Sequence, residues 1–288
     1  MEINLNGNFF NLYYWIPIAL TFIILFIIWF IFKNKTYEQQ NKLIIILLFF
    51  NLFFHLTKLF FEPYLSGLPS TIRNISFENI CAVSTLIFPF LYLSKNRILK
   101  DYLYYFGLLG GLAALFIPTE ALNQPFFTYD TIRFYIVHSI LLIAPILMML
   151  FKLHKINYKK YWQTLVVFVV VLIIIMVNEW ILGLLGWVDM TLFFDRGYRN
   201  SSFIFGPTPM FDKVANYIID PLVPNFLRKD YFNLGIVDFY FPILWMTGII
   251  VVYGSILLLG LASLFDYQTI KDDFIKIFKK KEKRGESI

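Results

Sequence analysis

The segment Tyr161–Trp187 reads YWQTLVVFVVVLIIIMVNEWILGLLGW, and it decides the fold class of this protein. Glu179 is its single charged residue. About 20 consecutive apolar residues are enough for an α-helix to cross the hydrocarbon core of a bilayer. The segment therefore predicts a membrane-spanning helix, with a carboxyl group close to one of its ends.

The composition of the whole chain supports this interpretation. Of its 288 residues, 59% are hydrophobic, 20% are aromatic and only 15% are charged, which is typical of an integral membrane protein and excludes a water-soluble globule. Seven apolar runs have membrane-spanning length, so we expect an all-α, polytopic protein with seven transmembrane helices. The runs are Tyr13–Phe32, Leu43–Phe61, Ile75–Leu93, Tyr102–Pro118, Thr131–Phe151, Tyr161–Trp187 and Phe239–Phe265.

Lysine and arginine gather in alternate connections, and this predicts the orientation of the chain. Cytoplasmic connections carry an excess of basic residues. We therefore expect the N-terminus outside and the C-terminus in the cytoplasm, in a multi-pass protein of the cell membrane. The basic residues on the expected cytoplasmic side are Lys33, Lys35, Lys42, Lys95, Arg97, Lys100, Lys152, Lys155, Lys159, Lys160 and, in the tail, Lys271 through Arg284.

The expected domains are a seven-helix transmembrane domain over residues 1–266 and a basic cytoplasmic tail over residues 267–288. In the tail, Ile270, Phe274 and Ile277 recur at helical spacing among lysines. This pattern predicts an amphipathic helix on the anionic inner leaflet. The net charge of +6 is then explained by membrane topology, and no nucleic-acid partner is expected.

The long connection over residues 188–238 is expected to lie outside the cytoplasm. Its glycines and prolines predict a folded loop, and the residues near Phe211–Ile219 predict a short helix within it. These glycines and prolines are Gly206, Pro207, Pro209, Pro221 and Pro224.

The second run carries a polar face in its outer half. Asn51, His55, Lys58 and Glu62 follow one another at steps of four, three and four residues, which places them on one side of a helix. Further polar residues fall in the outer halves of the third, fifth and sixth runs: Glu78, Asn79, Cys81, Arg133, His138, Asn178 and Glu179.

An ionised side chain facing lipid at the centre of a helix costs about 2.5 kcal/mol or more, so these groups must converge. Two roles remain open for them. They either form a packing network, in which Lys58 pairs with Glu62 or Glu179, or they line a cavity open to water. On the fourth run, small residues predict a close-packing face for a neighbouring helix. These are Gly107, Gly110, Gly111, Ala113 and Ala114.

Cys81 and His138 attract attention because of their expected depth. At a rise of 1.5 Å per residue, both lie roughly 9 to 10 Å below the outer ends of their runs. A neutral imidazole within hydrogen-bond reach of a thiol can take its proton, and the thiolate can then attack an acyl carbonyl. Taken singly, Cys81 is also compatible with a small apolar filler of the core, and His138 with a hydrogen-bonded core group.

Several stretches around these residues resemble one known family. Glu78-Asn79-Ile80-Cys81, Phe134-Tyr135-Ile136-Val137-His138 and the glycine-rich Tyr105–Pro118 resemble the YwaF family of bacterial integral membrane proteins, whose animal relatives are the transmembrane protein 164 acyltransferases. A weaker likeness follows in Tyr198-Arg199-Asn200 and Gly206-Pro207-Thr208-Pro209. The chain departs from the family pattern at Asn79 and Ile80.

The resemblance implies acyl transfer between membrane phospholipids, with Cys81 as nucleophile and His138 as base. The partners would be a phospholipid or a lysophospholipid, and no cofactor and no metal are expected, since neither a nucleotide fingerprint nor a helical metal-binding signature is present. Lys58, Arg133 or Arg199 would bind the lipid phosphate, and Asn79 or Asn178 would supply oxyanion donors. The full set of candidate substrate-binding residues is His55, Lys58, Glu78, Asn79, Arg133, Asn178, Glu179, Arg199 and Asn200.

Two other functions remain open. A transporter or a ligand- or pH-sensing protein would use the intramembrane ionisable groups to bind a solute or a proton, and these are His55, Lys58, Glu62, Glu78 and Glu179. An assembly factor for other membrane proteins would form a stable complex with a partner.

Overall fold

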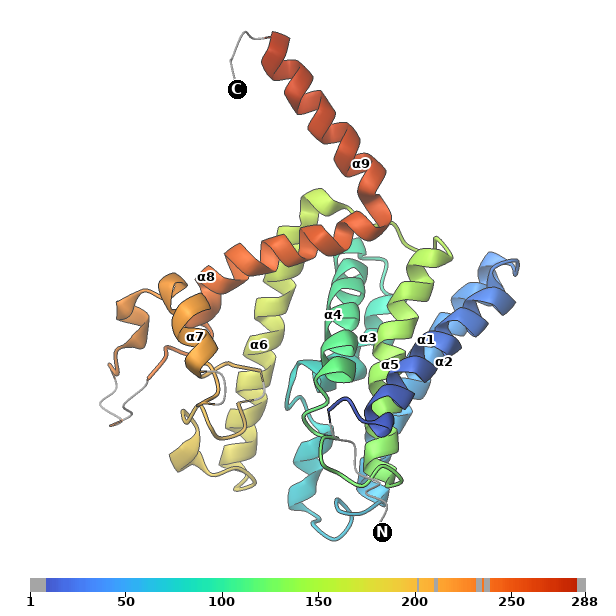
Figure 1. Cartoon of the computed structure of the whole chain (residues 1–288). Coiled ribbons are helices and arrows are strands. Elements are labelled where there is room, and N and C mark those ends of the chain that lie inside the picture. Colours follow the sequence, from blue (N-terminus) through green and yellow to red (C-terminus); the bar gives the residue numbers. More distant parts are fainter. Residues whose placement is uncertain (1–8, 201, 210–211, 232–234, 236–238, 284–288) are drawn as a thin grey trace.

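The computed structural model describes residues 9–200, 202–209, 212–231, 235 and 239–283, and this part of the chain is helical, without a β-strand. Figure 1 shows α1 to α5 gathered on one side, with α6 beside α4 and the last helix lying across both. The helices are α1 Leu12–Phe32, α2 Tyr37–Leu56, α3 Ile80–Leu93, α4 Arg97–Phe116, α5 Tyr129–Leu150, α6 Tyr161–Leu184, α7 Asp212–Ile218, α8 Thr247–Ile249 and α9 Ser255–Lys283.

The expected class of an all-helical, multi-pass membrane protein agrees with these helices, but a count of seven spans is not shown. Within the described residues, five helical stretches are long and apolar enough to cross a membrane. α3 has only 14 residues, about 21 Å at 1.5 Å per residue, and α4 does not belong to the five. The five are Leu12–Phe32, Tyr37–Phe60, Tyr129–Leu150, Tyr158–Leu184 and Leu244–Lys276.

The core is centred on α5, whose spanning window is 78% buried. α5 packs against α4, α2 and α1, and side chains such as Tyr102 and Leu103 of α4 and Leu141 and Leu147 of α5 are completely buried. A helix surrounded in this way is apolar on every face. Its few polar residues must therefore find partners inside the bundle.

The close-packing face expected on α4 is present at two of its glycines. A Cβ on Gly107 would stand 2.8 Å from the Leu141 carbonyl oxygen, and a Cβ on Gly111 would stand 2.8 Å from the backbone nitrogen of Leu142. Only glycine permits this approach of α4 to α5. Gly110 faces α3 instead, and Ala113 is exposed. The face of α4 that packs closely against α5 is therefore narrower than the predicted one.

α2 ends earlier than its apolar pattern predicts. It stops at Leu56, and the chain continues as a 3₁₀ turn, Thr57–Phe60, which carries Lys58. Asn51, His55 and Lys58 are all buried, as their shared face predicts. Glu62 is different, because it lies beyond the turn on the surface, where it accepts a hydrogen bond from the Ser66 N–H. The expected Lys58–Glu62 pair is therefore wrong.

The long connection after α6 is folded, as expected. Asn200 is its centre: the side-chain amide donates to the carbonyls of Arg196 and Gly206 and accepts from the Phe205 N–H. The expected short helix is α7, which begins at Asp212. Phe211, the first residue of the prediction, lies outside the described residues.

The last helix bends at Asp266, one residue before the expected start of the tail. Figure 1 shows the part beyond this bend projecting from the bundle. Its base is held by the fifth connection, because the Tyr158 hydroxyl donates to Asp273 over 2.8 Å and Lys159 pairs with the same carboxylate. Residues 284–288 of the expected tail lie outside the described residues.

Gly111→Ala tests the contact between α4 and α5. The new Cβ would press on the α5 backbone, so we expect a loss of about 1–3 kcal/mol in the free energy of unfolding. The matched control is Gly260→Ala on α9, where a Cβ meets nothing within 4 Å. Thermal unfolding in detergent measures both variants. Equal stabilities for the two would contradict the packing described above.

Candidate functional site

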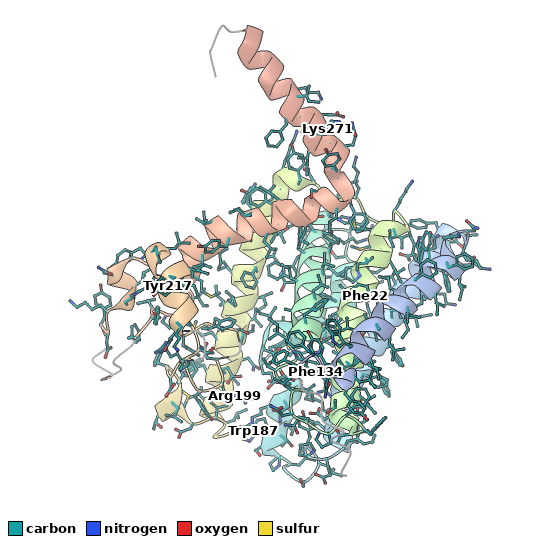
Figure 2. The ribbon with its side chains drawn as sticks, viewed as in Figure 1. Phe22, Phe134, Trp187, Arg199, Tyr217 and Lys271 are labelled. Carbon is teal, nitrogen blue, oxygen red and sulfur yellow. The ribbon has the colours of Figure 1, made fainter. Side chains whose placement is uncertain are left out.

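A polar pocket of about 300 Å³ lies where the turn after α2, the start of α3 and the start of α5 meet. Figure 2 places Arg199 and Trp187 at this end of the molecule. The pocket has both cationic and acidic walls, drawn from segments far apart in the sequence. It is lined by Lys58, Tyr64, Asn74, Glu78, Asn79, Glu120, Asp130 and Arg199.

A smaller cavity of about 20 Å³ continues this pocket, with room for about one water molecule. The two share Lys58, Glu78, Asn79 and Glu120, so the polar pocket leads directly to the cavity. Cys81 of α3 and His138 of α5 lie on its wall together. Its other lining residues are His55, Ala82, Thr85, Arg133 and Val137.

The hydrogen bond of His138 fixes its tautomer. Nδ1 lies 2.8 Å from the carbonyl oxygen of Phe134, one helical turn earlier. A carbonyl oxygen can only accept, so Nδ1 carries the proton and Nε2 of the neutral ring keeps a free lone pair. By the same reasoning Nε2 of His55, 3.3 Å from the Ile75 carbonyl, carries that ring's proton. The ring atom of His138 that can accept a proton is therefore Nε2.

Cys81 occupies the second position of α3, and the sequence fixes this helix start. Asn79 is the N-cap, and its Oδ1 accepts a hydrogen bond of 2.8 Å from the Ala82 N–H. The Ile80 N–H donates to the Ser202 hydroxyl of the long connection. Cys81 therefore lies in the first turn of α3, beside the positive end of the helix dipole.

Three ion pairs join the segments around the pocket. Glu78 lies 3.5 Å from Lys58 Nζ and 3.6 Å from Arg199 Nη2. Arg199 also donates two hydrogen bonds to Glu179 of α6, over 2.8 and 3.0 Å. Lys58 Nζ donates a further bond to the Asn74 carbonyl over 2.9 Å. The network links the turn after α2, the start of α3, the long connection and α6.

Burial alone would lower the pKa of the Arg199 guanidinium. The hydrogen bonds to Glu179 and the charges of Glu179 and Glu78 act in the opposite direction, and the net shift of the pKa is upward. Arg199 is therefore a permanent cation, held between the carboxylate of Glu179 in α6 and that of Glu78 just before α3.

Arg133 is buried and contributes to the wall of the small cavity. Its Nε and Nη2 both donate to Oδ1 of Asp130, over 3.2 and 2.7 Å. The Tyr64 hydroxyl donates to the same oxygen over 3.0 Å. Arg133, Lys58 and Arg199, the three cations considered for a lipid phosphate, are thus all engaged by carboxylates.

Three of the candidate residues line neither cavity. Asn178 donates to the Ser76 hydroxyl over 3.0 Å. The side-chain amide of Asn200 forms its hydrogen bonds within its own loop. Neither lines the polar pocket or the small cavity. Glu179 is also absent from both linings and acts on the pocket through Arg199. Within the described residues, no group of three His, Cys, Asp or Glu side chains is placed to hold a metal ion.

Sequence reasoning missed several lining residues. Glu120 lines both cavities, yet it lies in the connection before α5, where no helical periodicity could identify it. Tyr64 and Asn74 also come from a connection. Thr85 had a usable signal, because it follows Cys81 by four residues and therefore shares its helical face.

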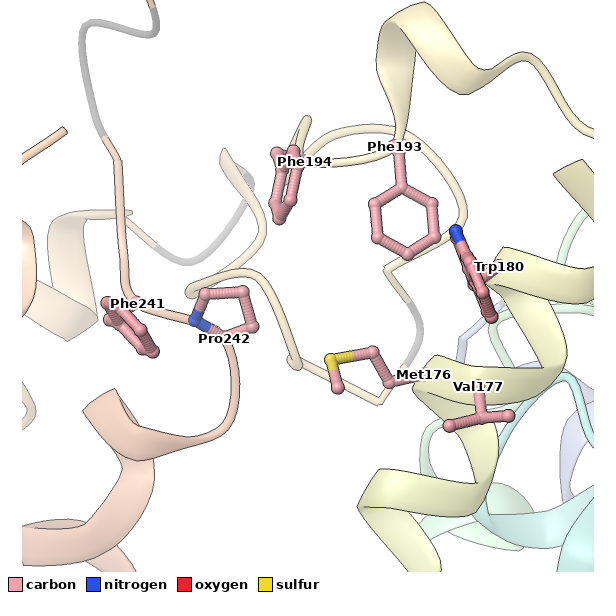
Figure 3. A pocket seen from close by; sticks show the side chains of 7 residues that line it. All are labelled: Met176, Val177, Trp180, Phe193, Phe194, Phe241 and Pro242. Atoms are coloured by element: carbon pink, nitrogen blue, oxygen red, sulfur yellow. The ribbon is translucent and has the colours of Figure 1, made fainter. Parts of the chain in front are cut away.

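A further pocket, apolar and about 340 Å³ in volume, lies beside the part of α6 that carries Glu179. Figure 3 shows Trp180 and Met176 of α6 facing Phe193, Phe194 and the chain just before α8. Glu179, next to Trp180, holds Arg199 in the wall of the polar pocket.

Arg199→Gln tests whether the charge network is needed for the fold. The change leaves the Glu179 carboxylate buried beside a neutral group, so the free energy of unfolding should fall by about 2–3 kcal/mol. Adding Glu179→Gln should recover part of this loss, since it removes the unpaired charge. Thermal unfolding of the two single variants and the double variant completes the cycle. Strict additivity would mean that the two side chains do not interact.

Comparison with known proteins gives one match. The family model described as the TMEM164 family matches residues 9–212, a range that includes every residue lining the polar pocket and the small cavity. No curated protein and no solved structure shows detectable similarity to the chain. Because the matched range covers more than half of the 288 residues, this chain belongs to the TMEM164 family.

Proposed function

We propose that this protein transfers acyl chains between membrane phospholipids, with Cys81 as the nucleophile and His138 as the base. One observation carries the proposal: the thiol and the imidazole come from different helices, yet they line one cavity that continues into a polar pocket. The bare Nε2 of His138 gives the cavity a proton acceptor. The family resemblance of the cysteine and histidine segments supports the same pair, and we propose that the chain belongs to the bacterial YwaF branch.

The reaction has two halves. In the first, the Cys81 thiol gives its proton to His138 Nε2, and Sγ attacks the ester carbonyl of a phospholipid. The ester C–O bond breaks, the departing lysophospholipid oxygen takes the proton from His138, and a thioester remains. In the second half, the hydroxyl of another lysophospholipid gives its proton to His138 and attacks the thioester. Sγ leaves and recovers that proton. Water in place of this hydroxyl would give hydrolysis.

A lipid has two parts with opposite solvent preferences, and the site offers both environments. The polar pocket suits a headgroup, and the apolar pocket beside Trp180 suits a hydrocarbon chain. The basic connections predict that the N-terminus and the pocket face the outer side, in a seven-span arrangement. A site there needs no cytoplasmic coenzyme A, since the acyl donor is itself a membrane lipid.

The charge network favours a second candidate function, a transporter or a ligand-sensing protein. Glu78 bridges Lys58 and Arg199, and such buried ion pairs also occur in membrane proteins that bind ions or protons. In that case the charges would be essential and the thiol dispensable. The two functions therefore make opposite predictions for the same two variants.

Cys81→Ala should abolish acyl transfer from a phospholipid to a lysophospholipid in proteoliposomes, because the covalent intermediate cannot form. His138→Gln should lower the rate by about 10²–10⁴-fold, the range for a general base. Product formation is followed by mass spectrometry of the lipids. The control is Gly260→Ala, in open space on α9.

Full lipid turnover by Cys81→Ala would refute the transferase proposal. Loss of solute uptake or ligand response in Glu78→Gln, together with normal behaviour of Cys81→Ala, would favour the second candidate function.

A further inference from the structure

We propose that the first turn of α3 forms the oxyanion hole of this site, with the Cys81 backbone N–H, the Asn79 side-chain amide and the Thr85 hydroxyl as its donors. This inference rests on the proposed acyl transfer and adds the groups that would stabilise its charged intermediate. Asn79 was one of two candidates suggested by the sequence. Cys81 N–H and Thr85 emerge only from the hydrogen-bond pattern of the folded helix.

The helix start leaves one N–H group free beside the thiol. The Ile80 N–H donates to the Ser202 hydroxyl, and the Ala82 N–H donates to Asn79 Oδ1. Between them, the Cys81 N–H has no acceptor among the described residues. This N–H and the nucleophilic sulfur belong to one residue. A carbonyl carbon bonded to Sγ therefore holds its oxygen close to that N–H.

The capping role of Asn79 orients its amide. Because Oδ1 accepts from the Ala82 N–H, the other end of the amide must be the Nδ2 group, which donates hydrogen bonds. Asn79 lines both the polar pocket and the small cavity. The structure shows no acceptor for Nδ2 within its described part. The cap thus fixes the helix with one atom and offers a donor to the cavity with the other.

Thr85 supplies the independent sign of a polar ligand. Thr85 is 1% exposed and lines the small cavity. Its hydroxyl has no hydrogen-bond partner in the described part of the chain. It lies one turn beyond Cys81, about 6 Å deeper along α3. Leaving a buried hydroxyl unpaired is destabilising. An oxygen atom that enters the cavity would remove that cost.

The three donors match the charge that develops during acyl transfer. As Sγ forms its bond to the carbonyl carbon, the π electron pair moves to the carbonyl oxygen, which becomes negative. When the intermediate collapses, that pair re-forms the double bond, the ester C–O bond breaks, and the departing oxygen takes the proton from His138. Fixed donors at a helix N-terminus stabilise the negative oxygen without having to reorganise.

Two reactions of the same thiol test this inference. Acylation of Cys81 by p-nitrophenyl octanoate passes through an oxyanion, whereas alkylation by iodoacetamide is a direct displacement and forms none. Both need the thiolate, so a change in the thiol itself alters both rates. The rates are measured in detergent from the mass of the Cys81 peptide, for wild type, Asn79→Ser and Thr85→Val.

Asn79→Ser keeps a capping oxygen for α3 but removes the amide donor. We expect acylation to slow by about 10²–10³-fold, the range for one oxyanion-hole donor, while alkylation stays unchanged. Thr85→Val should slow acylation by about 10-fold without a loss of thermal stability, because replacing an unpaired hydroxyl with a methyl group of the same shape is nearly neutral. The matched control is Asn96→Ser, the same change at the N-cap of α4.

Normal acylation in both Asn79→Ser and Thr85→Val, with a reactive wild type, would overturn the oxyanion hole and leave the proposed acyl transfer intact. Equal slowing of acylation and alkylation would also count against it, because the variants would then act on the thiol or on folding. A wild-type Cys81 that is alkylated but never acylated would overturn the proposed function as well.

Discussion

Polar groups inside an apolar helical bundle must satisfy one another, and the end of this protein that carries the polar pocket depends on that constraint. Lys58 is buried and is neutralised by Glu78, which also faces Arg199. Arg199 in turn neutralises Glu179 of α6. Removing Glu78 would leave Lys58, and removing Arg199 would leave Glu179, buried without its charged partner, at a cost of about 3–5 kcal/mol. The network therefore fixes how the start of α3, the long connection and α6 are placed relative to one another.

The same network builds the site. By holding the long connection against α3 and α6, Arg199 brings Ser202 to the first turn of α3, where its hydroxyl accepts from the Ile80 N–H. That turn carries Cys81. On the opposite wall, α5 approaches α4 closely through Gly107 and Gly111, and this approach sets the position of His138. Two separate packing constraints, one electrostatic and one steric, thus meet at the small cavity.

Prediction from sequence succeeded for features that depend only on the spacing of residues within one helix. The shared face of Asn51, His55 and Lys58 is buried because residues three and four apart lie on one side of a helix. It failed at Glu62, where α2 had already ended and a 3₁₀ turn changed the direction of the side chains. It also failed to find Glu120, because a residue in a connection is placed by the folding of distant segments and leaves no periodic signal.

The sequence by itself determined that this chain is an all-helical membrane protein, because long apolar runs have few other stable environments. It also determined that Asn51, His55 and Lys58 would be buried together, since their shared face follows from local spacing. Only the tertiary structure decided the partners of those groups. It pairs Lys58 with Glu78, gives Asn178 to Ser76, and brings Cys81 and His138 to one cavity. The reason is physical. The residues that share one face of a helix follow from their spacing in the sequence, whereas a contact depends on how two helices are packed.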